Sequence, residues 1–252
     1  MLTVAAQTLK RVVLPIAALL LFMIGLGVLL TRAATHLWPL TIEDSVNREL
    51  AGDRTETLDD VSHLVSGIAD TPRIIGVTAV AALVLWLVLR RWREPLFLCL
   101  AVTAQALVFY FTTLAIDRPR PAVQRLDESP PTSSFPSGHT SAAVALYLGL
   151  ALLLAGLARH TWVKALCWAL ILVPLGVALS RMYRGMHHPS DVVAAFINGV
   201  TCVIVMSRAL LDRIRGISSA TGGRRSLPSV PAARRRAAGA WRPGWPARAG
   251  RS

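Results

Sequence analysis

The sequence predicts an all-α, polytopic membrane protein with six transmembrane helices. Of its 252 residues, 54% are hydrophobic, and the mean hydropathy of +0.52 exceeds that of an ordinary soluble domain. The apolar residues also form six long runs that contain no Asp, Glu, Lys or Arg, as membrane spans do. These runs are residues 12–31, 74–89, 95–116, 140–158, 165–179 and 192–207.

The length of each run decides whether it can form a span. A helix needs about 20 residues to cross roughly 30 Å of hydrocarbon. The shorter runs reach this length when flanking polar side chains extend toward the interface. The fifth run is the weakest, because Lys164 lies near its start and Pro174 lies inside it. The first run is longer than a typical signal-peptide core and has no persuasive cleavage site after it, so we interpret it as a span.

Positive charge is distributed unevenly between the two sides of the predicted membrane domain. The net charge is +13, and 11 of the 27 Lys and Arg residues lie from Arg208 onward. Together with the N-terminus and two short turns, this places 18 positive residues on one side and 9 on the other. Positive charge favours the cytoplasmic side, so both termini are expected there and the longer loops outside. These outer loops are about 32–71, 117–139 and 180–191.

The predicted domain organisation has three parts: a cytoplasmic N-terminus (1–11), a six-helix membrane domain (12–211) and a basic tail (212–252). The tail is rich in Gly, Ala, Ser, Pro and Arg, a composition typical of disorder. Anionic membrane lipids are its expected partners. Nucleic acid is the alternative, but no folded basic surface accompanies the tail. The excess of Arg over Lys, 25 to 2, is typical of GC-rich bacterial genomes and suggests a bacterial plasma membrane.

The first outer loop, 32–71, is expected to contain two short amphipathic helices. Residues 41–44 resemble a capping arrangement, and apolar residues follow at helical spacing through Val65 and Ile68. Such helices lie on the membrane surface. They either pack against the rim of the bundle or serve as a lid for a lipid site, and the sequence leaves both readings open.

Three polar clusters stand at the outer ends of the apolar runs. Ser137 and Gly138 begin the predicted fourth helix, whose free amide groups and dipole favour an anion. Arg120 and Arg181 carry guanidinium groups that match phosphate oxygens. The combination predicts a phosphate-binding site. The clusters are Asp117-Arg118-Pro119-Arg120-Pro121, Pro136-Ser137-Gly138-His139, and Ser180-Arg181 with His187-His188-Pro189-Ser190-Asp191.

Two histidines give this site its predicted chemistry. Asp191 follows His187 by four residues, a spacing that can bring its carboxylate to one imidazole nitrogen and leave the other free as a nucleophile. His139 can protonate a leaving oxygen. A single interfacial His or Arg is more often an ordinary polar residue at headgroup level. That explanation does not account for three such clusters on one predicted face.

The clusters resemble the signature of the type 2 phosphatidic acid phosphatase (PAP2) family, also called lipid phosphate phosphatases and related to vanadium haloperoxidases. That signature is Lys-x6-Arg-Pro, Pro-Ser-Gly-His and Ser-Arg-x5-His-x3-Asp. The second element matches in full at 136–139 and the third at 180–191. The first matches at 120–121, but Thr113 occupies the lysine position. The resemblance covers roughly residues 70–210.

The resemblance implies a role for each matching residue. His187 would attack phosphorus and Asp191 would orient it, while His139 would protonate the leaving oxygen and later activate water. No metal or other cofactor is implied. Residues at the matching positions would bind the phosphoryl oxygens, namely Arg120, Arg181, Ser137 and Gly138.

The lysine position is the one departure from the signature. Thr113 cannot supply a positive charge, and Arg118, near the same helix end, is the candidate replacement. Without a replacement the site has one phosphate ligand fewer, and loss of one such donor costs roughly 10²–10³ in rate in other enzymes.

The predicted function is hydrolysis of a lipid phosphomonoester or diphosphate through a phosphohistidine intermediate. Candidate substrates are phosphatidic acid, phosphatidylglycerol phosphate and a polyprenyl diphosphate. One alternative is a non-catalytic protein that binds lipid phosphate, and the other is a phosphotransferase that uses an acceptor other than water. The intact histidines argue against the first alternative, and only acceptor assays separate the second. A haloperoxidase is disfavoured because those relatives are soluble.

Overall fold

A computed structural model of the protein describes residues 6–33, 37–128 and 132–211. Within these residues, six helices are long and apolar enough to cross a membrane, so the six predicted spans are confirmed. Lys10 and Arg11 lie within the first helix rather than before it. The predicted basic tail, 212–252, lies outside the described residues. The six helices are Ala6–Ala33, Thr71–Leu89, Arg93–Ala115, Gly138–Leu157, Thr161–Tyr183 and Pro189–Leu210.

Three of the spans are built from several helical segments. The first joins η1 (Leu9–Val13), α2 (Leu14–Val28) and η2 (Leu29–Ala33). The fourth joins α7 (Gly138–Ala143), η4 (Val144–Leu148) and α8 (Gly149–Leu157), and the fifth joins α9 (Thr161–Trp168), η5 (Ala169–Ile171) and α10 (Leu172–Tyr183). The second, third and sixth spans are the continuous helices α5 (Thr71–Leu89), α6 (Arg93–Ala115) and α11 (Pro189–Leu210).

Proline explains the break in the fifth span. Pro174 lies in the first turn of α10, four residues after Leu170. A proline inside an α-helix lacks the amide hydrogen and its ring clashes with the carbonyl four residues before it. The tighter 3₁₀ turn of η5, which contains Leu170, accommodates this. The fifth span therefore exists as predicted but is interrupted where the sequence is least helical.

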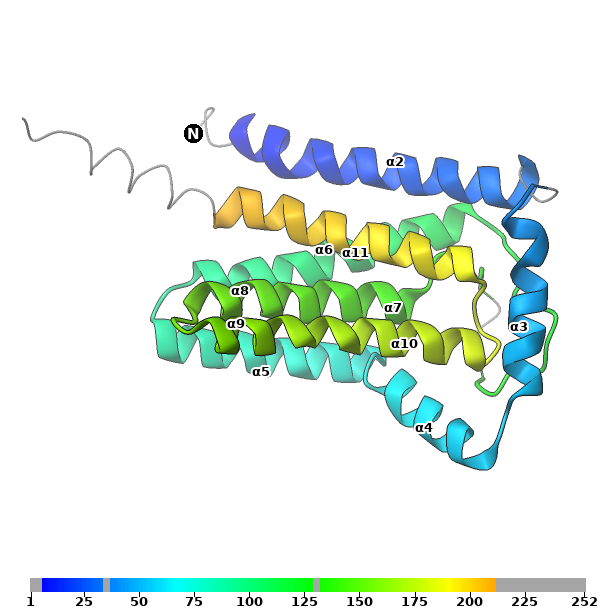
Figure 1. The fold of residues 1–252 in the computed structure, drawn as a ribbon. Coiled ribbons are helices and arrows are strands. Elements are labelled where there is room, and N and C mark those ends of the chain that lie inside the picture. Colours follow the sequence, from blue (N-terminus) through cyan, green and yellow to red (C-terminus); the bar gives the residue numbers. More distant parts are fainter. Residues whose placement is uncertain (1–5, 34–36, 129–131, 212–252) are drawn as a thin grey trace, which may run out of the picture. The chain divides into compact units, whose positions relative to one another are not determined.

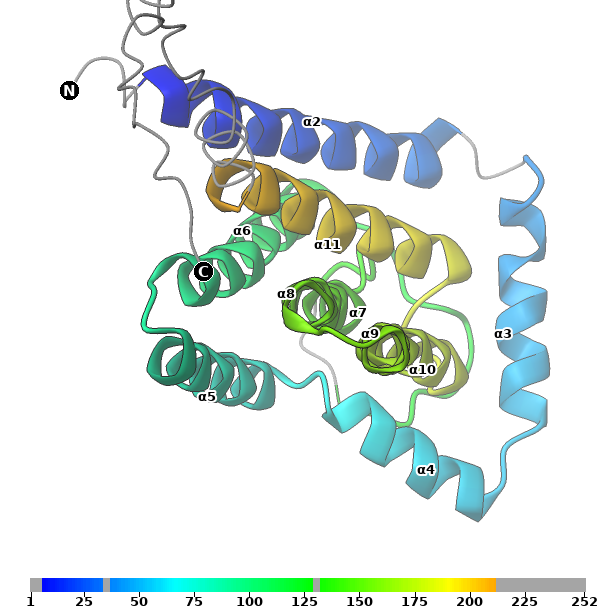
Figure 2. The ribbon, with the colours of Figure 1, turned by 60° about the vertical axis from the view of Figure 1, so that its left-hand side comes forward.

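The fourth span lies at the centre of the bundle. Figure 2 shows α7 and α8 nearly end-on, with α6, α11, α10 and α5 around them. In its most apolar stretch, 61% of the fourth span is buried, against 17% for the first and second spans, whose apolar side chains face outward. A Cβ atom on Gly199 of α11 would lie 2.7 Å from Val144, so glycine is needed for α11 to approach η4 this closely. The fourth span, which carries His139, and the sixth span, which begins two residues after His187, thus share the core.

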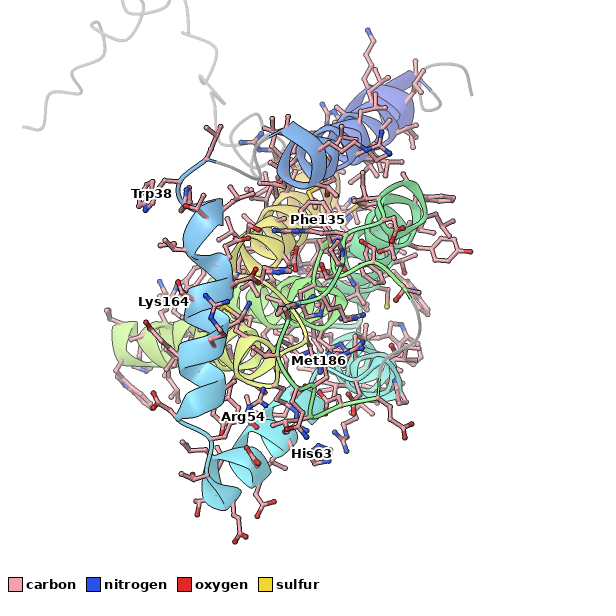
Figure 3. All side chains as sticks on the ribbon, turned by 90° about the vertical axis from the view of Figure 1, so that its right-hand side faces the viewer. Trp38, Arg54, His63, Phe135, Lys164 and Met186 are labelled. Carbon is pink, nitrogen blue, oxygen red and sulfur yellow. The ribbon has the colours of Figure 1, made fainter. Side chains whose placement is uncertain are left out.

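The first outer loop contains the two expected helices, α3 (Glu43–Gly52) and α4 (Glu56–Gly67). Helix α3 follows the 3₁₀ turn η3 (Leu40–Ile42) and has no side-chain cap, so the predicted cap at residues 41–44 is not formed. The bundle has two ends, and α3 crosses the one that lies away from the start of α2 (Figures 1 and 3). Helix α4 contacts α10. The loop therefore lies against the ends of the spans where the polar clusters were predicted.

Candidate active site

The three polar clusters meet at the end of the bundle that α3 crosses. The backbone amide of Ser137, in the second cluster, donates to the carbonyl of Asp191, in the third, over 3.2 Å. The Nη1 of Arg120, in the first cluster, donates to the Met186 carbonyl over 2.8 Å. In Figure 3, Phe135 and Met186 mark the segments just before the second and third clusters. The three clusters therefore lie in contact with one another.

His187 is buried at this convergence, with 4% of its surface exposed. Its Nδ1 lies 2.7 Å from the carbonyl oxygen of Ser134, which can only accept, so Nδ1 carries the proton and the Nε2 lone pair is free. Burial lowers the pKa of His187 to about 3, against the charge of Asp191 and helped by Arg181 and Arg120. The imidazole is therefore neutral at physiological pH, as a nucleophile must be.

Asp191 is fully buried in the first turn of α11 but does not hydrogen-bond His187. The distance between His187 Nδ1 and Asp191 Oδ2 is 3.9 Å. Oδ2 instead accepts the backbone N–H of His188 over 2.8 Å and completes the capping box of α11. The contact expected from the four-residue spacing is absent because the helix start uses this carboxylate. Asp191 acts on His187 through its charge and through the start of α11.

Arg118 lies against Asp191 rather than toward an open phosphate site. Its Nη1 donates to Asp191 Oδ1 over 2.5 Å and to Ser190 Oγ over 2.7 Å, and its Nη2 donates to Glu43 Oε2 over 2.7 Å. Glu43 Oε1 accepts the backbone N–H of Ser190 over 2.8 Å. Both terminal nitrogens are occupied by carboxylates, so the expectation that Arg118 replaces the missing lysine is not supported. Its contacts hold Asp191 in place.

Arg120 has an unused donor in the same site as His187. Its Nε is buried and has no hydrogen-bond partner among the described residues. Burial, followed by the charge of Arg125, lowers the pKa of Arg120 from its ordinary value, against the charge of Asp191. A buried donor without a partner is costly, and an anion beside it would remove both this cost and the repulsion between the arginines. Arg120 therefore fits a phosphate ligand.

Arg181, in the last turn of α10, is the charged group shared by the two catalytic candidates. Its charge acts on the imidazoles of both His187 and His139, so both rings lie within electrostatic range of one guanidinium. Its Nη1 donates to Asp127 over 2.7 Å and to Ser66 over 2.9 Å. Its Nε is buried without a partner in the described part of the chain. The guanidinium of Arg181 is thus held through Nη1, and its Nε remains available as a donor.

The helix start at Ser137 and Gly138 provides backbone donors. Ser137 is fully buried and caps α7, with its Oγ 2.9 Å from the Thr140 hydroxyl. The amide groups of Gly138 and His139 have no acceptor among the described residues. A Cβ on Gly138 would lie 2.8 Å from the Phe109 ring, so glycine also serves the packing of α7 against α6. Two free amides at a helix N-terminus favour a phosphoryl oxygen.

His139 has a partner that its sequence motif does not contain. Its Nε2 lies 3.0 Å from Asp70 Oδ1, and 30% of its side chain is exposed. Asp70 precedes α5, and its other oxygen pairs with Arg73 over 3.1 Å. The His139 ring is therefore partly open to solvent.

Thr113 leaves the lysine position without a charge in the structure as well. Its hydroxyl donates over 2.9 Å to the carbonyl of Phe109, one turn earlier in α6. Arg118, the nearest candidate in the sequence, is committed to Glu43 and Asp191. The remaining arginines and the amides of the helix start are therefore the donors available to a phosphate at this site.

Comparison with known proteins identifies this arrangement. The family model described as the PAP2 superfamily matches residues 94–215, which contain all three clusters. The part of the chain that carries the three clusters is thus similar to the PAP2 superfamily. No curated protein matches the chain closely enough to be significant.

Two solved PAP2-like structures share its fold. One is a transmembrane PAP2-type phosphatidylglycerolphosphate phosphatase from Bacillus subtilis, with a TM-score of 0.64, 20% identity, and coverage of 81% of this chain and 96% of that one. The other is LpxE from Aquifex aeolicus, with a TM-score of 0.53, 20% identity, and coverage of 68% and 98%. At this identity the similarity establishes the PAP2 membrane fold.

The residues that sequence reasoning missed lie largely outside the PAP2 match. Glu43, Ser66 and Asp70 precede residue 94 and come from the first outer loop. Asp127 lies within the match but between the motifs. The only sequence signal for these partners was the concentration of acidic residues in the outer loops. Nothing in the sequence indicated which arginine or histidine each acidic residue would contact.

Proposed function

We propose that this PAP2 protein is a metal-independent lipid phosphate phosphatase that works through a phosphohistidine intermediate. The observation that carries the proposal is the state of His187, which is neutral, donates from Nδ1 to Ser134 and keeps Nε2 free. Arg120 and Arg181 act on it by their charge, and each has a buried Nε without a partner among the described residues. A neutral imidazole facing concentrated positive charge suits attack on a phosphate ester.

The first chemical step transfers the phosphoryl group to His187. The Nε2 lone pair forms a bond to phosphorus while the bond to the leaving oxygen breaks, and the electron pair leaves with that oxygen. His139 donates a proton to it, so the alcohol departs neutral. The charge on the phosphoryl oxygens is stabilised by Arg120, Arg181 and the free amides at the start of α7.

The second step returns the enzyme to its starting state. His139, now neutral, accepts a proton from water as the water oxygen attacks phosphorus. The bond from phosphorus to Nε2 of His187 breaks, and inorganic phosphate leaves. An acceptor alcohol in place of water would give phosphotransfer from the same intermediate.

An apolar groove beside the site supports an amphiphilic substrate. The groove has a volume of about 480 Å³ and is lined by Ile68, Arg73, Gly76, Val77, Val80 and Tyr147. Its polar end adjoins Asp70, the partner of His139, because Arg73 pairs with Asp70. Its apolar length follows α5, one of the two least buried spans, so a lipid chain could reach it from the bilayer. Phosphatidic acid, phosphatidylglycerol phosphate and polyprenyl diphosphate all have this form.

The charge distribution supports an orientation. In the sequence, 18 of the 27 Lys and Arg residues belong to the N-terminal segment, the two short turns and the stretch from Arg208 onward, and positive charge favours the cytoplasm. We therefore place both termini inside and the active site at the outer leaflet, in a bacterial plasma membrane.

The test is phosphate release by the detergent-solubilised full-length protein from the three candidate lipids, with and without EDTA. We expect release from at least one lipid, unchanged by EDTA, and an acid-labile phosphoprotein after rapid quenching with labelled substrate. His187→Ala should abolish both, whereas His160→Ala, an exposed histidine in the turn between α8 and α9, should not. Equal release by wild type and His187→Ala would refute the mechanism, and binding of lipid phosphate without turnover would favour a binding protein.

A further inference from the structure

We propose that Asp70, from the first outer loop, is a positioning residue for His139, the general acid and base of the reaction. This inference rests on the proposed phosphatase function and assigns it a residue outside the PAP2 match. The observation is the contact of 3.0 Å between Asp70 Oδ1 and His139 Nε2.

The contact fixes which nitrogen of His139 can exchange a proton. An ionised carboxylate only accepts hydrogen bonds, so Nε2 carries a hydrogen and faces Asp70. The proton that leaves and returns during turnover must then be on Nδ1. Without Asp70 the ring could adopt the other tautomer or rotate, and the fraction of molecules with a proton aimed at the leaving oxygen would fall.

Asp70 is held in place by the segment that also holds Arg181. The amide of Ala69 donates to the Ser66 carbonyl over 3.0 Å, and the amide of Asp70 donates to Gly67 over 3.1 Å. Ser66 Oγ accepts from Arg181 Nη1 over 2.9 Å. A single tight turn between α4 and α5 therefore contacts both a phosphate-binding arginine and the general acid, which sets their relative position.

Charge from three elements acts on the His139 ring. These charged groups are Arg181 of α10, Asp127 of the loop after α6 and Asp70 before α5. Of these groups, Asp70 hydrogen-bonds the ring. When His139 gives its Nδ1 proton to the leaving oxygen, Asp70 keeps its hydrogen bond to Nε2, and the neutral ring can take a proton from water in the next step.

Asp70→Asn tests this role without removing the side chain. The Asp70 side chain does not cap α5, and asparagine is itself a good residue at this position, so the fold should be retained. The protein should be compared on a long-chain alkyl phosphate, whose leaving group needs a proton, and on p-nitrophenyl phosphate, whose leaving group does not.

We expect kcat/KM for the alkyl phosphate to fall by about 10- to 100-fold, as part of the 10²–10⁴ that general acid catalysis contributes. The kcat/KM for p-nitrophenyl phosphate should change by less than about 3-fold, because the departure of p-nitrophenolate gains little from general acid catalysis. The alkaline limb of the alkyl phosphate profile should also move to lower pH, because the protonated ring loses a neighbouring negative charge.

Asp60→Asn is the matched control, since Asp60 is an exposed carboxylate on α4 of the same loop. It should behave as wild type on both esters. Equal losses on the two esters in Asp70→Asn, or no loss on either, would overturn the positioning role while leaving the phosphatase intact. A wild-type protein that hydrolyses neither ester nor any lipid phosphate would instead contradict the proposed function and this inference with it.

Discussion

Arg118 and Glu43 are joined by a hydrogen bond of 2.7 Å across 75 residues of sequence, and both are buried. The other side of the Arg118 guanidinium holds Asp191, in the first turn of the helix that follows the nucleophile. The outer helix α3 is thus connected through one arginine to the start of α11. This chain of ionic contacts explains why the loop packs against the site instead of extending over the membrane.

Glu43→Gln should destabilise the protein and slow turnover. The amide can still accept from Ser190, but Arg118 loses one of its two buried carboxylates. A hydrogen bond to a charged group is worth about 1.5–3 kcal/mol, so we expect the thermal midpoint to fall by several degrees. Thermal unfolding in detergent and kcat measure the two effects. Glu49→Gln, on the exposed face of α3, is the control, and equal midpoints for both variants would contradict the role of Glu43.

Acid should destabilise the folded protein through His187. The pKa of His187 is lowered to about 3, so between pH 6.5 and that value the unfolded chain binds a proton that the folded protein does not. Stability is therefore lost as pH falls below about 6.5, by up to about 1.4 kcal/mol for each pH unit. His187→Asn can keep a donor toward Ser134 but has no titrating group. Its thermal midpoint should fall less than that of wild type between pH 7 and pH 4, and parallel curves would contradict the prediction.

Thr113→Lys should strengthen phosphate binding. The position lies in the last turn of α6, where the family signature has a lysine, and the structure places no substitute charge there. One additional donor at such a site is worth roughly 10²–10³ in rate in other enzymes, so an increase of at least about tenfold in kcat/KM is expected. Thr113→Val, which has a similar size and no charge, should give no increase. If both variants match wild type, the site is complete without the lysine.

Asp127→Asn should weaken phosphate binding through Arg181. Burial raises the pKa of Asp127, but the hydrogen bond from Arg184 and the charges of Arg181 and Arg184 outweigh it and lower the pKa. Asp127 is therefore ionised throughout the working range and orients Arg181 at any pH above about 4. We expect KM to rise about tenfold, with a ratio to wild type that stays constant from about pH 5 to pH 8. Glu128→Gln, its exposed neighbour, is the control, and a ratio that varies with pH would contradict the assignment.

The fold was predictable because membrane spans are encoded locally. Charge-free apolar runs located all six helices, and Pro174 indicated the weak point of the fifth, where η5 interrupts it. The start of α11 was also marked by Pro189. What the sequence could not indicate was that the fourth span lies at the centre, since its apolar content resembles that of its exposed neighbours.

The site was predictable where motif residues contact one another and not where loops supply the partners. The convergence of Ser137, Arg120 and His187 followed from motifs at the ends of spans. The spacing from His187 to Asp191 suggested a hydrogen bond, but the first turn of α11 uses that carboxylate for its own amide groups. The pairing of Asp70 with His139 depends on contacts across 69 residues, which no local pattern contains.

The turn between α4 and α5 has a practical consequence for engineering. Because Ser66 contacts Arg181 and Asp70 contacts His139, replacing residues 37–70 with the loop of another family member would change the catalytic centre even if every motif residue were kept. A functional chimaera would have to carry Glu43, Ser66 and Asp70 together with the bundle that they contact. The first outer loop is thus part of the proposed catalytic centre and cannot be exchanged as a passive linker.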